Sequence, residues 1–400
     1  MIKKYWKWQF SRWWPILLIF SVVLVSAFFL TASVISLVES SGGRTGSIEY
    51  YYRSGAGIGV EIYIFAALAM ITTFIMPFSV FAYRTKKQSV DVFYQAAYKP
   101  GTIKRIRILL GLIIIVASFT LAYIIGIAIL GIRYAATPST YTYEYGGSTI
   151  IQTRVYVNFA VYILAYFVIL FIVVGQYFIN CFLISLGDYV LDQIFLLIAG
   201  NIVLFLGIYA PFVLIQNLLS IGSHGNFRVS GVLYPIFMMP SPLPAFYFLN
   251  APIYGLLRGH YMNEATLVVN TIAFIIFIGF SVGLCLFNLL QRDPSGEYAN
   301  LRGARNKAVS LIPHGAALAL GLLVASAFAA MFRSGIGGIG SIAVPLFGLT
   351  LFATAHYALL ALWRHSFKPT RIDLTCFLAV NGLIDLLTIL GIAVGAVNGY

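Results

Sequence analysis

The chain has 400 residues, of which 60% are hydrophobic and only 9% are charged, and its mean hydropathy is +0.93. Soluble domains carry about 25% charged residues, so this composition excludes a soluble fold. The formal net charge of +13 would indicate a nucleic-acid partner in a soluble protein. In a membrane protein, Lys and Arg instead face anionic headgroups and set topology, and we interpret the charge in that way.

Several segments are long and apolar enough to cross a bilayer, which takes about 20 apolar residues. They lie at 14–38, 57–83, 108–132, 155–185, 194–219, 266–290, 309–331, 342–363 and 374–397. The sequence therefore predicts an all-α polytopic membrane protein with nine transmembrane helices. We divide it into a core bundle of six spans at 1–291 and three additional spans at 292–400.

The first span follows a flank of basic and aromatic residues, including Lys3, Lys4 and Trp8, which is typical of a cytoplasmic interface. With the N-terminus inside and the chain alternating between sides, 18 of the 25 Lys and Arg residues fall in inner segments. This asymmetry agrees with the positive-inside rule. It places the C-terminal Tyr400 outside.

The inner loop at 84–107 contains the pattern of a short amphipathic helix at 88–98. Ser89 can cap this helix, and Pro100 followed by Gly101 ends it. Its apolar residues Val90, Phe93, Tyr94 and Ala97 recur at helical spacing. Such a face can dock into a groove on a soluble partner. It can equally lie along lipid headgroups.

The stretch at 77–112 resembles the inner-loop pattern of bacterial ABC exporter permeases. In that pattern a span ends in Phe-x-Tyr, a basic patch and Ser-Val-Asp precede a short helix, and a second basic cluster opens the next span. The matching residues here are Phe81, Tyr83, Lys86, Lys87, Ser89, Val90, Asp91, Tyr94, Lys104 and Arg105. The resemblance implies a location in the bacterial cytoplasmic membrane.

The resemblance also implies partners. Two permease chains, identical or homologous, would form the path, and separate ABC ATPase subunits with their ATP and Mg would dock beneath them. The docking residues would be those of the coupling helix: Ser89, Val90, Asp91, Phe93, Tyr94 and Ala97. A second, shorter contact would be the inner turn at 186–192, which carries Asp188 and Asp192 and no basic residue.

Two outer segments have a distinct composition. The segment at 134–153 is rich in Tyr, Thr and Gly. The segment at 220–263 is aromatic and contains five prolines, too many for one spanning helix. We expect it to form a re-entrant loop that dips into the outer leaflet or roofs a cavity, or else an aromatic belt at the interface.

Motifs for nucleotide hydrolysis, zinc proteolysis and serine hydrolysis are absent from the sequence. The cysteines Cys181, Cys285 and Cys376 show neither metal-ligand spacing nor a disulfide pattern. We therefore expect no catalytic residue, metal or cofactor on this chain, and expect it to be a transport subunit and not an enzyme.

Ionisable residues inside spans are functional candidates because a charge at the bilayer centre is costly. Asp385, Glu61 and His356 lie in predicted spans. They could couple transport to protons, or they could only pack helices together.

The principal interpretation is a permease subunit of an ATP-driven exporter that moves an amphipathic or peptide-like molecule outward. The alternative is a proton-coupled secondary transporter using Asp385, Glu61 and His356. A third class, a membrane-embedded transferase, would place Glu39, Glu49 or Glu144 at an outer active site.

Topology gives the first prediction. Single cysteines introduced next to Lys86 or Lys368 should resist an impermeant thiol reagent in intact cells, because both positions fall in inner segments. Cysteines next to Arg228 or Tyr400 should react. Labelling next to Lys368 would contradict the assignment of the last two spans.

Overall fold

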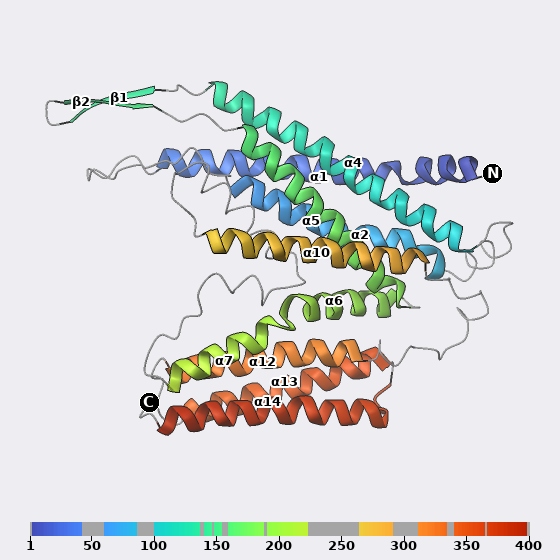
Figure 1. The fold of residues 1–400 in the computed structure, drawn as a ribbon, viewed down its shortest axis with the longest axis vertical. Coiled ribbons are helices and arrows are strands. Elements are labelled where there is room, and N and C mark those ends of the chain that lie inside the picture. The colour runs from blue at the N-terminus through green and yellow to red at the C-terminus, as the bar shows by residue number, and fades with distance from the viewer. Residues whose placement is uncertain are drawn as a thin grey trace.

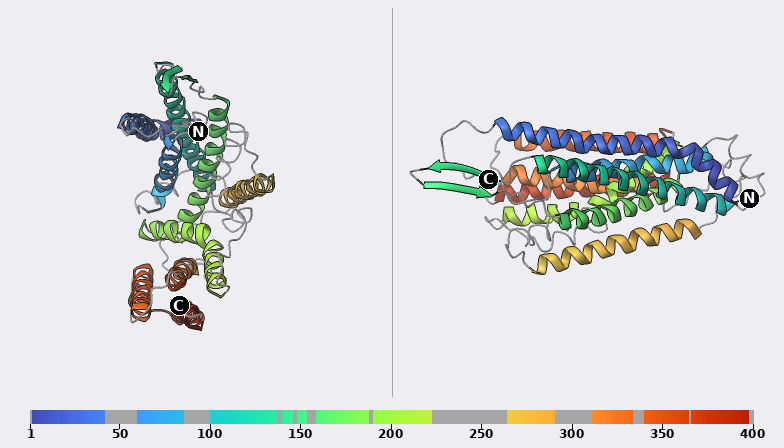
Figure 2. Two further views of the ribbon diagram at one scale, coloured as in Figure 1. Left: turned by 90° about the vertical axis from the view of Figure 1, so that its left-hand side faces the viewer. Right: turned by 90° about the horizontal axis from the view of Figure 1, so that it is seen from above.

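The computed structural model describes residues 2–41, 60–85, 100–136, 140–145, 148–153, 159–187, 190–222, 264–290, 311–333, 340–364 and 366–397. Its long helices run alongside one another, and the two chain termini lie at opposite ends of the bundle (Figure 1). The view along the helices shows them standing in a narrow, elongated array (Figure 2). The elements in chain order are α1 (Ile2–Ser41), α2 (Val60–Thr85), α4 (Pro100–Ala136), β1 (Thr140–Tyr145), β2 (Ser148–Thr153), α5 (Phe159–Ser185), α6 (Val190–Leu206), α7 (Tyr209–Gly222), α10 (Glu264–Leu290), α12 (Ile312–Arg333), α13 (Gly340–Arg364) and α14 (Arg371–Val397).

The predicted fold class, a polytopic helical membrane protein, is confirmed. Within the described residues, eight helices are long and apolar enough to cross a membrane, and the bent pair of α6 and α7 makes a ninth if it is counted as one span. An odd number of crossings agrees with the two termini lying at opposite ends (Figure 1). Which end faces the cytoplasm stays a prediction.

The helices share two main apolar cores. The larger core joins α1, α2, α4 and α5, and its fully buried side chains include Phe65, Phe119 and Tyr177. The smaller core joins α7, α12 and α14, around Leu214, Leu322 and Ile384. Helix α6 lies between the two groups and contacts both α5 and α12 (Figure 1). The contact between α6 and α12 joins the two predicted parts of the chain, 1–291 and 292–400. The division into these two parts stays a prediction.

A cluster of buried amide side chains fastens α6 to the larger group. Asn201 of α6 donates through Nδ2 to Oδ1 of Asn180 at 3.0 Å, and Gln176 donates to Oδ1 of Asn201 at 2.6 Å. Asn180 in turn donates to the carbonyl oxygen of Thr73 in α2 at 3.0 Å. Since a polar group in the hydrocarbon region finds no water, these bonds hold α2, α5 and α6 in one arrangement.

The predicted span at 194–219 is broken in the structure. Helices α6 and α7 differ in direction by 43° across Gly207 and Ile208. Pro211 has no N–H to donate to the Gly207 carbonyl four residues back, and its ring would clash there, so a continuous helix is disfavoured. A Cβ at Gly207 would also collide with the carbonyl oxygen of Val203. The Gly and Pro pair therefore explains the break.

A β-hairpin, which the sequence analysis did not predict, follows α4. Strands β1 and β2 pair antiparallel, with Thr140 opposite Thr153 and Tyr145 opposite Ser148. The alternating Tyr and Thr residues favour strands, and Gly146 with Gly147 is a sequence typical of a two-residue hairpin connection. The segment at 134–153 therefore contained a hairpin pattern, alternating Tyr and Thr residues followed by two glycines.

Close packing in the larger core depends on one glycine. The hydroxyl of the fully buried Tyr177 donates to the Ile108 carbonyl oxygen at 2.8 Å. A Cβ at Gly111 would collide with this hydroxyl and would lie 2.8 Å from the Cγ2 of Val80. The absence of a side chain at 111 therefore lets α5 approach α4.

We expect Gly111→Ala to destabilise the protein by about 1–3 kcal/mol, because the added methyl group overpacks a core with no free space. The measurement is the thermal unfolding midpoint, Tm, of the purified protein in detergent. Gly279→Ala and Gly283→Ala are the controls, since a Cβ at either position in α10 meets nothing within 4 Å. Equal Tm values for Gly111→Ala and the controls would contradict this account.

Candidate functional site: an apolar cavity beside a chain of buried polar side chains

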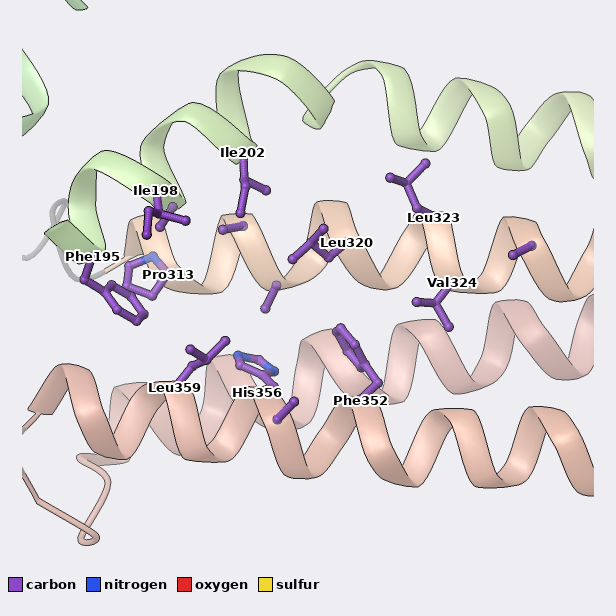
Figure 3. Close-up of a pocket in the computed structure, with 15 residues that line it drawn as sticks. Phe195, Ile198, Ile202, Pro313, Leu320, Leu323, Val324, Phe352, His356 and Leu359 are labelled. Atoms are coloured by element: carbon purple, nitrogen blue, oxygen red, sulfur yellow. The ribbon is translucent and has the colours of Figure 1, made fainter. Parts of the chain in front are cut away.

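A cavity of about 570 Å³ lies between α6, α12 and α13. Ile198 and Ile202 of α6 border one side, Phe352 and Leu359 of α13 border the opposite side, and α12 runs along the cavity with residues such as Leu320 (Figure 3). Among the described residues that line it, His356 is the only one with a polar side chain. The site therefore fits an apolar molecule or the apolar part of an amphipathic one.

Small residues on α12 leave room for this cavity. Ala316, Ala317 and Ala327 line it where larger side chains would fill the space between the helices. The ring of Phe195, near the start of α6, lies 5.3 Å from the ring of Trp363, near the end of α13. This contact joins α6 to α13 beside the cavity.

Behind the cavity, polar side chains from three helices form a chain in which each polar atom lies within 3.5 Å of the next. Asn381 of α14 places Nδ2 3.1 Å from Nδ1 of His356, and Nε2 of His356 lies 3.4 Å from Nδ1 of His314 in α12. Nε2 of His314 lies 3.5 Å from Oδ1 of Asp373 in α14. All four side chains are buried.

The far end of the chain is held by an ion pair and a helix cap. Nη2 of Arg364 lies 2.8 Å from Oδ1 of Asp373, a carboxylate that is 1% exposed. The Thr370 hydroxyl donates to Oδ2 of Asp373 at 2.6 Å. The backbone N–H of Thr370 also donates to Oδ2 of Asp373, and the backbone N–H of Asp373 donates to the Thr370 hydroxyl oxygen, both at 3.2 Å. This reciprocal pair is a capping box at the start of α14. It fixes the carboxylate that faces His314.

The donors and acceptors define a direction along the chain. An amide Nδ2 can only donate, and Asn381 is oriented by a second bond from Nδ2 to the Phe377 carbonyl oxygen at 2.7 Å, so Nδ1 of His356 accepts. Nε2 of His356 then carries the proton directed at Nδ1 of His314. The proton of a neutral His314 is left on Nε2, which lies 3.5 Å from Oδ1 of Asp373 without a formed hydrogen bond. Both imidazoles are neutral in this arrangement, and both ring nitrogens of His356 have protein partners. None of the described residues that line the cavity therefore presents a free side-chain hydrogen-bonding group to it.

Of the residues predicted to be functional, His356 lies at this site. Asp385 lies on α14, the helix that carries Asn381 and Asp373. Its side chain is exposed on the surface of this chain and has no hydrogen bond or ion pair with any described residue. Glu61 lies in the first turn of α2, and the position of its side chain is outside the described residues. Asp385 and His356 therefore do not belong to one cluster of polar side chains in the structure.

The predicted docking residues are described only in part. The whole coupling helix at 88–98 and Asp188 lie outside the described residues, as does the loop at 223–263. Asp192 is buried, at 2% exposure, in the first turn of α6. Docking at 88–98 and at the 186–192 turn both stay predictions.

Sequence reasoning did not identify His314, Asp373, Arg364 or Asn381. The capping box could have been found from Thr370-x-x-Asp373 ahead of the last apolar run. The two histidines are 42 residues apart in the chain, and no local pattern relates them. Among the described residues, no group of three or more His, Cys, Asp and Glu side chains could hold a metal ion.

The fold and the site together define a polytopic helical membrane protein with an intramembrane apolar cavity, an architecture compatible with a membrane transporter. No known protein family, curated protein or solved structure matches this chain. Its function must therefore be argued from its own residues.

Asp373→Asn should lower the Tm of the purified protein. Hydrogen bonds to a charged group contribute about 1.5–3 kcal/mol each, and the amide would lose the charge that pairs with Arg364. Asp385→Asn is the matched control on the same helix, because that carboxylate has no partner among the described residues. A smaller Tm loss for Asp373→Asn than for Asp385→Asn would contradict the assignment of Asp373 as an anchor.

Proposed function

We propose that this protein is the membrane-spanning permease subunit of an ATP-driven ABC exporter, and that its cavity holds the apolar part of an amphipathic substrate. The observation that carries the proposal is the cavity of about 570 Å³ between α6, α12 and α13. Small-molecule sites usually measure about 300–1,000 Å³, so this space suits one small ligand or one chain of a larger one.

A broken helix beside the cavity supports a transport role. The break at Gly207 lies one turn beyond Ile202, which lines the cavity. Discontinuous helices near the membrane midplane are a recurrent feature of transporter binding sites. A break allows the two halves of a span to shift relative to each other, and here both α6 and α7 pack on α12.

The ends of α2 and α4, which flank the proposed coupling helix, are rigidly joined. The Arg107 guanidinium of α4 lies 4.8 Å from the ring centre of Tyr83 in α2 and 5.2 Å from that of Trp13 in α1. Cation–π contacts of this kind strengthen when water is excluded, and Arg107 is 5% exposed. A displacement of the intervening loop would therefore move α1, α2 and α4 together.

From these helices a displacement has a physical route to the cavity. The bond between Asn180 and Thr73 joins α5 to α2, and the bonds of Asn201 join α6 to α5. Helix α6 then borders the cavity with Ile198 and Ile202. We infer that ATP-driven movement of the coupling helix reaches the substrate through this amide cluster, as a rigid-body shift of packed helices.

A proton-coupled secondary transporter is the second candidate, and one observation favours it. The chain from Asp373 through His314 ends at His356, on the wall of the cavity. Buried chains of Asp and His are common elements of proton-driven transporters. The proton-coupled candidate predicted from the sequence used Asp385, Glu61 and His356. The candidate argued here uses His356 with His314 and Asp373.

Retention of an ATPase subunit separates the two candidates. We expect the native protein to co-purify with an ATPase, and a Phe93→Ala, Tyr94→Ala double variant to lose it, because truncation of a buried aromatic anchor costs about 2 kcal/mol or more at an interface. The measurements are identification of the co-purified chains and their ATP hydrolysis rate.

The matched control is Lys86→Gln with Lys87→Gln, in the same loop but off the apolar face. These charges should affect contact with headgroups more than docking. An aromatic variant that keeps its ATPase while the basic variant loses it would contradict the coupling helix. A native protein that never retains an ATPase, in any preparation, would contradict the exporter and leave the proton-coupled carrier.

A further inference from the structure

The polar chain behind the cavity is built for neutral histidines, yet it ends on a carboxylate. His356 accepts at Nδ1 from Asn381 and directs its Nε2 proton to His314, which directs its own proton to Asp373. The Asp373 carboxylate is already paired with Arg364, so the neutral chain is electrically balanced. Adding one proton would place a net positive charge next to an apolar cavity.

We propose that the cavity binds either an apolar ligand or a proton on the His314–His356 pair, but not both at once. This inference rests on the proposed role of the cavity as the substrate site. It gives the second candidate, the proton-coupled transporter, a mechanism in which His356, His314 and Asp373 exchange a proton for an apolar substrate.

The protonation step needs only a small rearrangement. Asn381 swings its amide away from Nδ1 of His356 and keeps its bond to the Phe377 carbonyl oxygen. A hydronium ion that reaches the cavity then gives its proton to Nδ1 of His356, so one O–H bond breaks, one N–H bond forms and a water molecule is left. The imidazolium donates from Nε2 to Nδ1 of His314, and Nε2 of His314 faces the Asp373 carboxylate at 3.5 Å, so the aligned dipole of His314 and the carboxylate stabilise the added charge. No other covalent bond forms or breaks.

Competition follows from hydration. An imidazolium at the cavity wall would draw water into a space that is otherwise lined by apolar side chains. An apolar ligand would have to expel that water and leave the charge without solvent. By linkage, if the bound proton lowers the affinity for the ligand by some factor, the bound ligand lowers the affinity for the proton by the same factor.

Among the described residues, few other charged groups face the histidine pair. Helix α12 contributes His314 itself, α13 contributes Arg364 through its contact with Asp373, and α14 contributes Asp373 and the uncharged Asn381. Helix α6 faces the cavity with Phe195, Ile198, Ala199 and Ile202, none of which titrates. The pH response of ligand binding should therefore come from the two histidines and Asp373.

Binding of N-phenyl-1-naphthylamine, a neutral apolar fluorescent probe, to the purified full-length protein in detergent tests the inference. The saturable fluorescence increase gives the Kd between about pH 8 and about pH 5, the range in which histidine titrates. For the native protein we expect affinity to fall with decreasing pH, by up to about tenfold per pH unit where one proton is linked. His356→Gln should bind the probe with an affinity that does not change with pH, and His314→Gln, which keeps the protonated residue, should show a weaker pH response than the native protein.

Two further variants separate the proton site from the cavity itself. Ala355→Phe and Ala327→Phe fill the cavity from exposed positions on α13 and α12, so they place little demand on folding. Both should reduce probe binding at every pH. Asp385→Asn, a neutralised carboxylate outside the cavity, should keep the pH response of the native protein.

Each outcome decides a stated point. A native Kd that is independent of pH, or a pH response that survives unchanged in His356→Gln, overturns the proton inference and leaves the cavity as a binding site. Probe binding that is unchanged in both cavity-filled variants, or absent in the native protein, overturns the cavity site of the proposed function and the inference with it. A pH response lost in Asp385→Asn alone overturns the assignment to the histidine pair.

Discussion

Inside a membrane, polar groups must find their partners within the protein, and this constraint shapes the whole arrangement. The amide side chains of Gln176, Asn180 and Asn201 bond to one another because no water is available to them. Arg107 is covered by aromatic rings for the same reason. Each such cluster joins helices that apolar packing alone would leave free to slide, since lipid tails are as apolar as the side chains.

The same constraint gives the cavity its character. His356 uses both of its ring nitrogens on protein partners and so adds no polar atom to the space it lines. The result is an apolar site with a titratable group directly behind its wall. A site of this kind can sense the presence of an apolar ligand through the cost of charging the histidine. It gives the proton-coupled candidate a physical basis that Asp385 does not provide.

The exporter and the carrier place different demands on the same helices. For an ATP-driven permease, the coupling path runs from the loop after α2, through the Thr73 and Asn180 contact, to α6. For a carrier, the path is only the short chain from Asp373 to His356. Both paths end at one cavity, from opposite sides. Helix α6 lies between the two apolar cores, so it can transmit a movement of the larger core to the cavity (Figure 1).

The sequence by itself determined the fold class and the spans, because a run of about 20 apolar residues has a single stable solution in a bilayer, a helix with all its backbone bonds internal. It also contained the capping box at Thr370 and the Gly207 and Pro211 pair that breaks the fifth span, although the break was not predicted.

Tertiary structure alone decided which polar residues meet. His314, His356 and Asp373 come from three helices, and the faces that these helices present to one another depend on packing between small residues such as Ala317 and Gly321. Asp385 illustrates the limit from the other direction. It lies four residues beyond Asn381, yet its side chain is exposed, because adding four residues to a helix of 3.6 residues per turn rotates a side chain by about 40°. Depth in a span can be read from a sequence, whereas the direction of a side chain depends on its neighbours.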